Sequence, residues 1–177
     1  MKFHLAQINP TVGDIEQNVS KIVNIIKNNQ NNVDVIVFPE MAMIGYPPQD
    51  LLLIPDFLKS VSEGLLKISE SIIECTVIVG TIRTEKNSLY NSAAIIGPDK
   101  KIYFRDKYLL PTYDVFDEKR YFKSSESVNP FIMIKDQQSI SLGVQICEDL
   151  WDDEYNMDVT KELVEGGASI IINISAS

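Results

Sequence analysis

The apolar run at residues 33–38 constrains the fold more than any other segment, because it reads Val-Asp-Val-Ile-Val-Phe and is closed by Pro39. Such a run is typical of a strand buried on both faces, in a sheet covered by helices. Before it, apolar residues recur at helical spacing from Ile15 to Ile26, behind Asp14 at the expected helix N-terminus. With an apolar segment at residues 3–8, this predicts a strand–helix–strand unit, whose crossover is almost always right-handed with parallel strands.

The rest of the chain continues the alternation of helices and strands. We expect helices at 56–74 and 157–165, strands at 76–82, 89–96, 101–105, 131–134, 140–146 and 168–174, and a polar loop at 106–129. The close spacing of the middle strands suggests an antiparallel meander. Gly166 and Gly167 are expected to cap the last helix in the left-handed conformation. The pattern predicts one α/β domain, with two sheets packed face to face and helices outside.

Composition excludes several classes of function. The 177 residues carry a net charge of −9, and an acidic chain repels phosphate backbones and anionic lipid, so we expect no nucleic-acid or membrane partner. His4 is the only histidine, and Cys75 and Cys147 are the only cysteines, which disfavours most zinc sites and histidine-dependent nucleophilic catalysis. We expect no metal. The N-terminal residues do not resemble a signal peptide, and two distant cysteines suggest reduced thiols, so the sequence predicts a cytoplasmic location.

Three chemically versatile side chains follow predicted strands, where α/β folds place their sites. Glu40 follows residues 35–39, Lys107 follows 102–106, and Cys147 follows 141–146. A thiol, a carboxylate and an ammonium provide a nucleophile, a base and a cation for acyl transfer. Taken singly, each has an ordinary interpretation as a core cysteine, a turn glutamate or a surface lysine. Cys75, which joins a helix to a strand without polar neighbours, is expected to be an inert core residue.

The segments around these three residues resemble the nitrilase (carbon–nitrogen hydrolase) superfamily. They read FPE at 38–40, YFRDKYLLP at 103–111 and GVQICED at 143–149, and they occur in the family's order. The resemblance implies an α-β-β-α sandwich with Cys147 as nucleophile, Glu40 as general base and Lys107 as transition-state stabiliser. Because the family's domain normally continues past residue 174, we expect the sandwich to be incomplete at its C-terminus.

Further segments resemble one branch of the family, the glutaminase domain of glutamine-dependent NAD synthetases. They read GYPPQDLL at 45–52, PTYDVFDEKRYF at 111–122 and CEDLW at 147–151. The first also reads as a proline-fixed loop that enters a helix. The resemblance implies that residues 1–177 are part of a domain that releases ammonia from glutamine to amidate nicotinate adenine dinucleotide. No cofactor is implied for that step. ATP and Mg²⁺ are implied only for a synthetase domain, absent from this sequence, that acts in cis or in trans.

The implied mechanism is attack of Cys147 on the glutamine side-chain amide to give a thioester, with Glu40 carrying the proton. Lys107 and the backbone N–H of Glu148 would stabilise the oxyanion. Five residues are expected near the substrate: Tyr113, Glu118, Glu148, Ser175 and Ser177. Glu118 would hold the Lys107 ammonium in place, although a weak surface salt bridge with Lys119 or Arg120 is its ordinary alternative. Tyr113 has the alternative of a packing aromatic, and the two serines that of terminal residues.

Two other functions remain open from the sequence. One is an amidase or carbamoylase that uses the same three residues on another small amide. The other is a catalytically silent interaction module. An incomplete sandwich would expose apolar surface and sheet edges, so we also expect a homo-oligomer.

Overall fold

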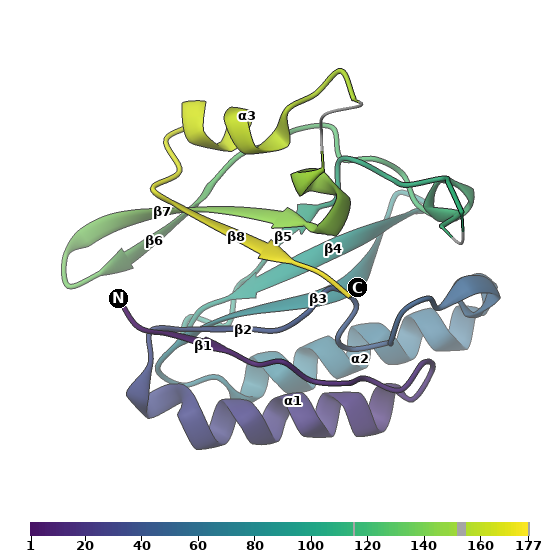
Figure 1. Ribbon diagram of the computed structural model, residues 1–177. Coiled ribbons are helices and arrows are strands. Elements are labelled where there is room, and N and C mark those ends of the chain that lie inside the picture. The colour runs from purple at the N-terminus through teal and green to yellow at the C-terminus, as the bar shows by residue number, and fades with distance from the viewer. Residues whose placement is uncertain (115, 152–154, 177) are drawn as a thin grey trace.

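In the part of the chain that the computed structural model describes, residues 1–114, 116–151 and 155–176, the strands form two sheets (Figure 1). The larger has the order β1-β2-β3-β4-β5, and the smaller the order β6-β7-β8. The strands are β1 (Phe3–Leu5), β2 (Val35–Val37), β3 (Thr76–Glu85), β4 (Ser88–Ile96), β5 (Ile102–Asp106), β6 (Phe131–Lys135), β7 (Gln138–Ile146) and β8 (Ile170–Ile174).

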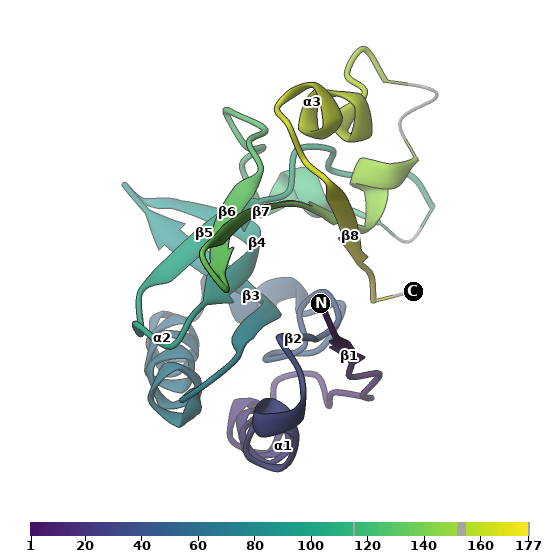
Figure 2. The same cartoon turned by 90° about the vertical axis from the view of Figure 1, so that its left-hand side faces the viewer.

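Helices cover the outer faces of both sheets. The α-helices α1 (Ile15–Asn29) and α2 (Pro55–Ser71) lie on the larger sheet, and α3 (Val159–Glu165) lies on the smaller one (Figure 2). Short 3₁₀ turns are η1 (Gln30–Asn32), η2 (Gln49–Leu53), η3 (Glu118–Arg120) and η4 (Cys147–Leu150). Asp14 and Asp158 cap α1 and α3 by accepting backbone N–H bonds, and Pro55 begins α2, where its missing N–H costs nothing. Within the described residues, no helix has the length and apolar character needed to cross a membrane.

Apolar side chains pack in three layers. One layer, with Ile22, Ile36 and Ile68, lies between the two long helices and the larger sheet. A second, with Val37 and Val144, joins the two sheets, and a third packs beneath α3. Ile36 belongs to the first layer and Val37 to the second, which explains why the segment 33–38 is almost continuously apolar. This arrangement confirms the predicted α/β class and the α-β-β-α sandwich.

The strand directions follow the predicted units, whereas several element ends differ from the expected ones. Strands β1, β2 and β3 are parallel, β3 to β5 form the antiparallel meander, β6 and β7 form a hairpin, and β7 and β8 are parallel. The first strand ends at Leu5 rather than residue 8, because its partner β2 is itself only three residues long. Of the two expected cap glycines, only Gly167 has a left-handed φ, at 93°. The loop 106–129 contains η3.

The topology brings several strand ends to one edge of the sandwich. Strand β5 runs in the same direction as β3, since each is antiparallel to β4, so β2, β3 and β5 end at the same edge of the larger sheet. Lys107 directly follows β5, and Glu40 comes three residues after β2. Cys147 directly follows β7 in the facing sheet, and Ser175 directly follows the parallel strand β8.

Candidate active site

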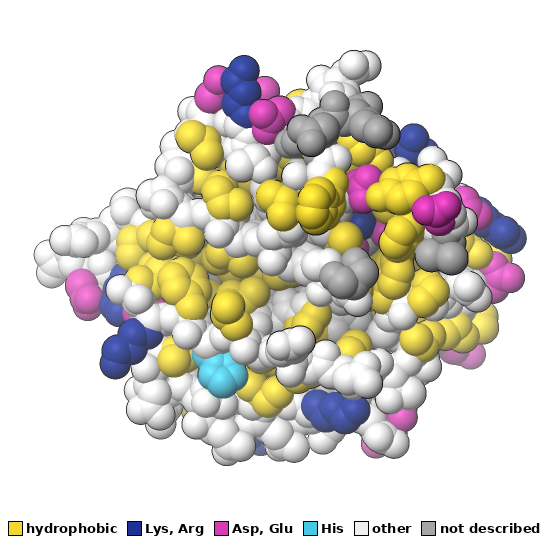
Figure 3. Space-filling view, viewed as in Figure 1, with side chains coloured by type: hydrophobic (Ala, Val, Ile, Leu, Met, Phe, Trp, Pro, Cys, Tyr) yellow, Lys and Arg dark blue, Asp and Glu magenta, His cyan; other side chains and the backbone are white. Residues whose placement is uncertain are grey.

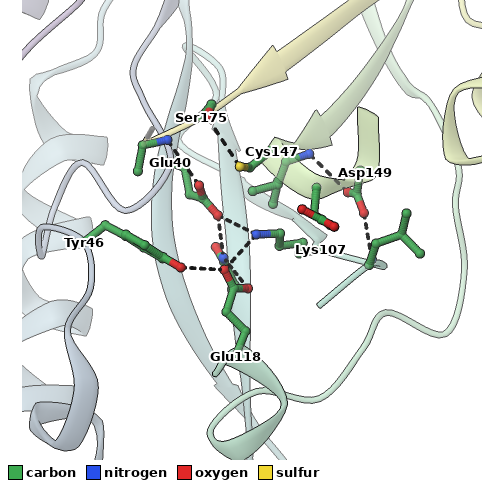
Figure 4. A network of polar contacts seen from close by, with 12 residues as sticks. Glu40, Tyr46, Lys107, Glu118, Cys147, Asp149 and Ser175 are labelled. Carbon is green, nitrogen blue, oxygen red and sulfur yellow. Dashed lines mark hydrogen bonds and ion pairs between the residues drawn. The ribbon is translucent and has the colours of Figure 1, made fainter. Parts of the chain in front are cut away.

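The Lys107 side chain lies at the centre of a buried polar cluster (Figure 4). It is 1% exposed, and its Nζ lies 2.8 Å from Glu40 Oε1 and 2.8 Å from Glu118 Oε1. Burial by itself would lower the pKa of Lys107, but the two carboxylates outweigh it and raise that pKa. The ammonium is therefore held charged and oriented at neutral pH.

The turn that carries Glu40 is fixed by close backbone packing on β3. A Cβ atom at Gly80 would lie 2.2 Å from Pro39 O and 2.5 Å from Glu40 Cα, so only glycine lets the two segments approach this closely. Pro39 O accepts the N–H of Gly80 at 3.1 Å. The residue after Glu40, Met41, has a left-handed φ of 50°. This packing places the Glu40 side chain in the interior, where it is 2% exposed.

The two carboxylate oxygens of Glu40 have different partners. Oε1 accepts hydrogen bonds from Lys107 Nζ and from Asn91 Nδ2, each at 2.8 Å. Oε2 accepts the backbone N–H of Ala176 at 3.2 Å, just beyond β8. The carboxylate therefore has one oxygen in the cation cluster and the other toward the end of β8.

Glu118 is a buried partner of Lys107 and not a surface residue paired with its basic neighbours. It is 4% exposed and accepts further hydrogen bonds from Tyr46 Oη at 3.2 Å and Asn91 Nδ2 at 3.3 Å. Burial raises the pKa of Glu118, while Lys107 partly offsets this effect and Glu40 adds to it.

Cys147 occupies a strained position at the end of β7. Its φ is 46°, a left-handed value that residues other than glycine seldom adopt and that clusters at functional sites. The partly buried Sγ accepts a hydrogen bond from Ser175 Oγ at 3.4 Å. Ser175 contacts the sulfur and the adjacent Ala176 contacts Glu40, so the end of β8 brings the thiol and the carboxylate to the same side of the cluster (Figure 4).

Asp149 and Arg105 form a second buried ion pair; we name these two residues the brace. Asp149 is 0% exposed, and Oδ1 accepts the backbone N–H groups of Tyr108 at 3.0 Å and Leu109 at 2.8 Å, while Oδ2 accepts that of Ile146 at 3.1 Å. Arg105 Nη2 lies 3.8 Å from Asp149 Oδ2. One carboxylate thus connects the residues that follow Lys107 to the residue that precedes Cys147.

Tyrosine hydroxyls hold Glu148, the residue after the thiol. Tyr113 Oη donates to its carboxylate at 2.9 Å, and Tyr155 Oη donates at 2.8 Å. The hydrogen bond to Glu148 raises the pKa of Tyr113, and burial together with the same carboxylate raises that of Tyr155. Tyr113 is 49% exposed, so it lies at the rim of the site. Ser177, the last expected substrate contact, lies outside the described residues.

The structure thus brings together Glu40, Lys107, Glu118, Cys147 and Ser175, and it places Tyr113 and Glu148 beside them. The sequence indicated no role for Asn91, Asp149, Tyr155 or Tyr46. A signal for Asn91 was present, because Asn91 and Ser92 are polar residues inside the mostly apolar segment 89–96. Among the described residues, no three His, Cys, Asp or Glu side chains are grouped so that they can share a metal ion.

Comparison with known proteins assigns the chain to a family. Residues 4–177 match the carbon–nitrogen hydrolase family. The chain belongs to the carbon–nitrogen hydrolase family. Over 98% of its length, this hydrolase chain is 39% identical to a glutamine-dependent NAD(+) synthetase from Synechocystis sp., and it covers 33% of that protein. The chain therefore spans about a third of the length of the curated relatives it matches.

Solved structures show the same fold. A glutamine-dependent NAD+ synthetase from Acinetobacter baumannii, in complex with ADP, superimposes with a TM-score of 0.87 at 30% identity over 99% of this chain and 32% of its own. An amidase from Nesterenkonia sp. superimposes with a TM-score of 0.81 at 16% identity, over 99% of this hydrolase chain and 64% of its own. The second similarity bears on the fold alone.

Proposed function

We propose that this domain hydrolyses the side-chain amide of glutamine to glutamate and ammonia, with Cys147 as the nucleophile. The observation that carries the proposal is the buried Lys107 ammonium, 2.8 Å from both Glu40 and Glu118, beside the strained Cys147 at the end of β7. Glutamine is favoured as substrate because the relatives that match nearly the whole chain are named glutamine-dependent NAD(+) synthetases.

The proposed steps use the residues in the positions described. The Cys147 sulfur attacks the amide carbon while Glu40 accepts the thiol proton, and Glu40 then returns that proton to the departing ammonia. Since Lys107 and Asn91 both bind Oε1 of Glu40, we assign the proton transfer to Oε2. Lys107 and the backbone N–H of Glu148 stabilise the oxyanion. Water, deprotonated by Glu40, then attacks the thioester carbon and releases glutamate, and Glu40 returns the proton to the departing Cys147 sulfur.

Substrate contacts and partners form part of the same proposal. Tyr113, Glu118, Glu148, Ser175 and Ser177 are assigned to the glutamine pocket. The glutaminase step as written needs no cofactor. The ammonia would pass to an ATP- and Mg²⁺-using NAD synthetase domain, in cis or in trans, which amidates nicotinate adenine dinucleotide. We place this reaction in the cytoplasm.

We also propose that the chain forms a homo-oligomer. Strands β1 and β8 are edge strands of their sheets, and Leu5 in β1 is 75% exposed. On the face that carries these two edges, hydrophobic side chains gather between the sheets (Figure 3). Sedimentation at high protein concentration should show a species larger than the monomer, and a compact monomer would contradict this part of the proposal.

Ammonia release tests the proposed reaction directly. The chain should release ammonia from glutamine faster than from a panel of aliphatic amides, and Cys147→Ala should lower the rate by at least about 10⁴-fold. Faster release from an aliphatic amide would favour the amidase alternative instead.

The two cysteines provide a matched control for the role of the thiol. A diazo-ketone analogue of glutamine should label Cys147 and spare Cys75, which is 1% exposed and whose thiol has a pKa raised by burial to about 11. Equal labelling of both cysteines, or of neither, would support the silent interaction module.

A further inference from the structure

We propose that Asn91 is a positioning residue of this reaction, because its amide group holds Glu40 and Glu118 in place on either side of Lys107. The inference rests on the proposed amide hydrolysis and extends it to a residue that does not touch the reacting atoms. Asn91 lies in β4, which contributes no other member of the cluster, and it is 1% exposed.

A single asparagine contacts all three charged residues of the cluster. Its Nδ2 donates to Glu40 Oε1 at 2.8 Å and to Glu118 Oε2 at 3.3 Å. Its backbone carbonyl accepts the N–H of Lys107 at 2.8 Å. The two side-chain contacts join residues 51 and 27 positions away in the sequence, so β4 supports both the loop that carries Glu40 and the loop that carries Lys107 and Glu118.

The orientation of the amide is determined by these acceptors. Nδ2 carries two N–H groups, and each one reaches a different carboxylate, whereas a flipped amide would place Oδ1 against two negatively charged groups. Among the described residues, Asn91 Oδ1 has no hydrogen-bond partner although it is buried. An unmet buried acceptor is unfavourable, so the two donated bonds, and not the stability of β4, account for an asparagine at this position.

A neutral donor suits this place for an electrostatic reason. Glu40 and Glu118 share a single ammonium, so the cluster carries more negative than positive charge. The amide stabilises both carboxylates without adding a second cation that would compete with Lys107 for them. It also fixes Oε1 of Glu40, which leaves Oε2 on the side of Ala176 and the thiol.

An isosteric acid provides the sharpest test. Asn91→Asp keeps the shape of the side chain, removes both N–H donors and adds a third carboxylate beside Lys107. At pH 8 we expect kcat for glutamine to fall about 10- to 100-fold with KM within about twofold, since Asn91 contacts no substrate. The loss should shrink as the pH falls, because a protonated Asp can donate one hydrogen bond. Asn91→Ala should show a similar loss of kcat without this recovery at low pH.

Gln30→Glu is the matched control for placing an acid where a buried amide was. Gln30 is 4% exposed, its side chain bonds the backbone of Ser71 and Ile73, and it lies before the start of β2, at the opposite end of the larger sheet from the cluster. This variant is expected to lose stability and to keep the kcat and the pH profile of the wild type. If both Asn91 variants behave like Gln30→Glu in an active protein, the inference is overturned.

An NMR measurement that does not depend on how the Asn91 variants fold separates this inference from the proposed function. In ¹⁵N NMR spectra, both Asn91 side-chain protons should exchange with solvent far more slowly than those of the exposed Asn28, and both should shift in Glu118→Gln. Fast exchange would overturn the positioning role even if glutamine is hydrolysed. Slow exchange with a response to Glu118→Gln, in a chain that hydrolyses no amide, would support the hydrogen bonding and refute the reaction.

Discussion

The two buried ion clusters of this hydrolase domain differ in their hydrogen-bond partners, which are side chains in one cluster and mainly backbone N–H groups in the other. Around Lys107, side chains from four separate segments contact one another, and both ion contacts are 2.8 Å long. In the brace, Asp149 is bonded to three backbone N–H groups, and Arg105 remains 3.8 Å away. Among the described residues, Nε and Nη2 of Arg105 have no hydrogen-bond partner.

The pKa shifts of the two cations reflect the same difference. Two close carboxylates raise the pKa of Lys107, whereas burial lowers that of Arg105 because its acidic neighbours only partly offset the loss of solvent. The contrast indicates that the two clusters have different roles. The brace holds backbone segments together, and the Lys107 cluster presents charged side chains to the thiol. Damage to the brace should therefore reduce stability and activity together, whereas damage to the cluster should reduce activity with little loss of stability at neutral pH.

The largest effect is expected from Asp149→Asn. This change leaves the buried Arg105 without its carboxylate and places an amide N–H against a backbone N–H. We expect the free energy of unfolding to fall by about 3–5 kcal/mol, measured by urea denaturation, with a parallel loss of the proposed release of ammonia from glutamine. Asp136→Asn, in the exposed turn between β6 and β7, is the control and should change stability by less than about 0.5 kcal/mol. A stable but inactive Asp149→Asn would contradict the structural role assigned to the brace.

A smaller effect, mainly on activity, is expected from Glu118→Gln at neutral pH. The amide still accepts a hydrogen bond from Lys107, but one of the two charges that hold the ammonium is lost. We expect kcat to fall about 10- to 100-fold, equivalent to about 1.4–2.7 kcal/mol, with the free energy of unfolding at pH 7 no more than about 1 kcal/mol below that of wild type. Glu126→Gln, an exposed glutamate paired with Lys123, should keep full activity. A loss of several kcal/mol of stability in Glu118→Gln would show that this cluster is structural as well.

The pH dependence of stability should change in the same variant. The pKa of Glu118 is raised in the folded chain above its ordinary value of 4.5, so the folded state binds this proton more tightly than the unfolded state. Its contribution to stability is complete below about pH 4.5 and is lost as the pH rises through the folded pKa, by about 1.4 kcal/mol for each pH unit between the unfolded and folded pKa values. Denaturation at several pH values should therefore show Glu118→Gln gaining stability relative to wild type from pH 4 to pH 8. A constant difference would contradict this sign.

The smallest effect is expected at Glu148, whose carboxylate accepts hydrogen bonds from two tyrosine hydroxyls. Tyr113→Phe removes one hydrogen bond to Glu148 but leaves the bond from Tyr155. We expect a loss of about 0.5–1.5 kcal/mol in transition-state stabilisation, measured as a fewfold drop in kcat/KM for glutamine. Tyr103→Phe, at a half-exposed tyrosine of β5 that contacts Phe131, should leave kcat/KM unchanged. A loss above about 100-fold in Tyr113→Phe would assign this hydroxyl a role equal to that of the charged residues.

The sequence by itself determined the element order, the parallel and antiparallel units and the strand ends that carry Glu40, Lys107 and Cys147. These features depend on local periodicity, since an apolar run, a helical spacing and a closing proline each act over a few residues. It also identified Glu118, through the resemblance of the segment 111–122.

The tertiary structure alone decided the partners of these residues. Asn91 meets Glu40 across 51 positions, and Asp149 meets Leu109 across 40. Such contacts depend on how the sheets pack and how each loop leaves its strand, which hydrophobic periodicity does not encode. A buried polar residue in a strand signals that it has a partner, but only the packed fold determines which partner it is.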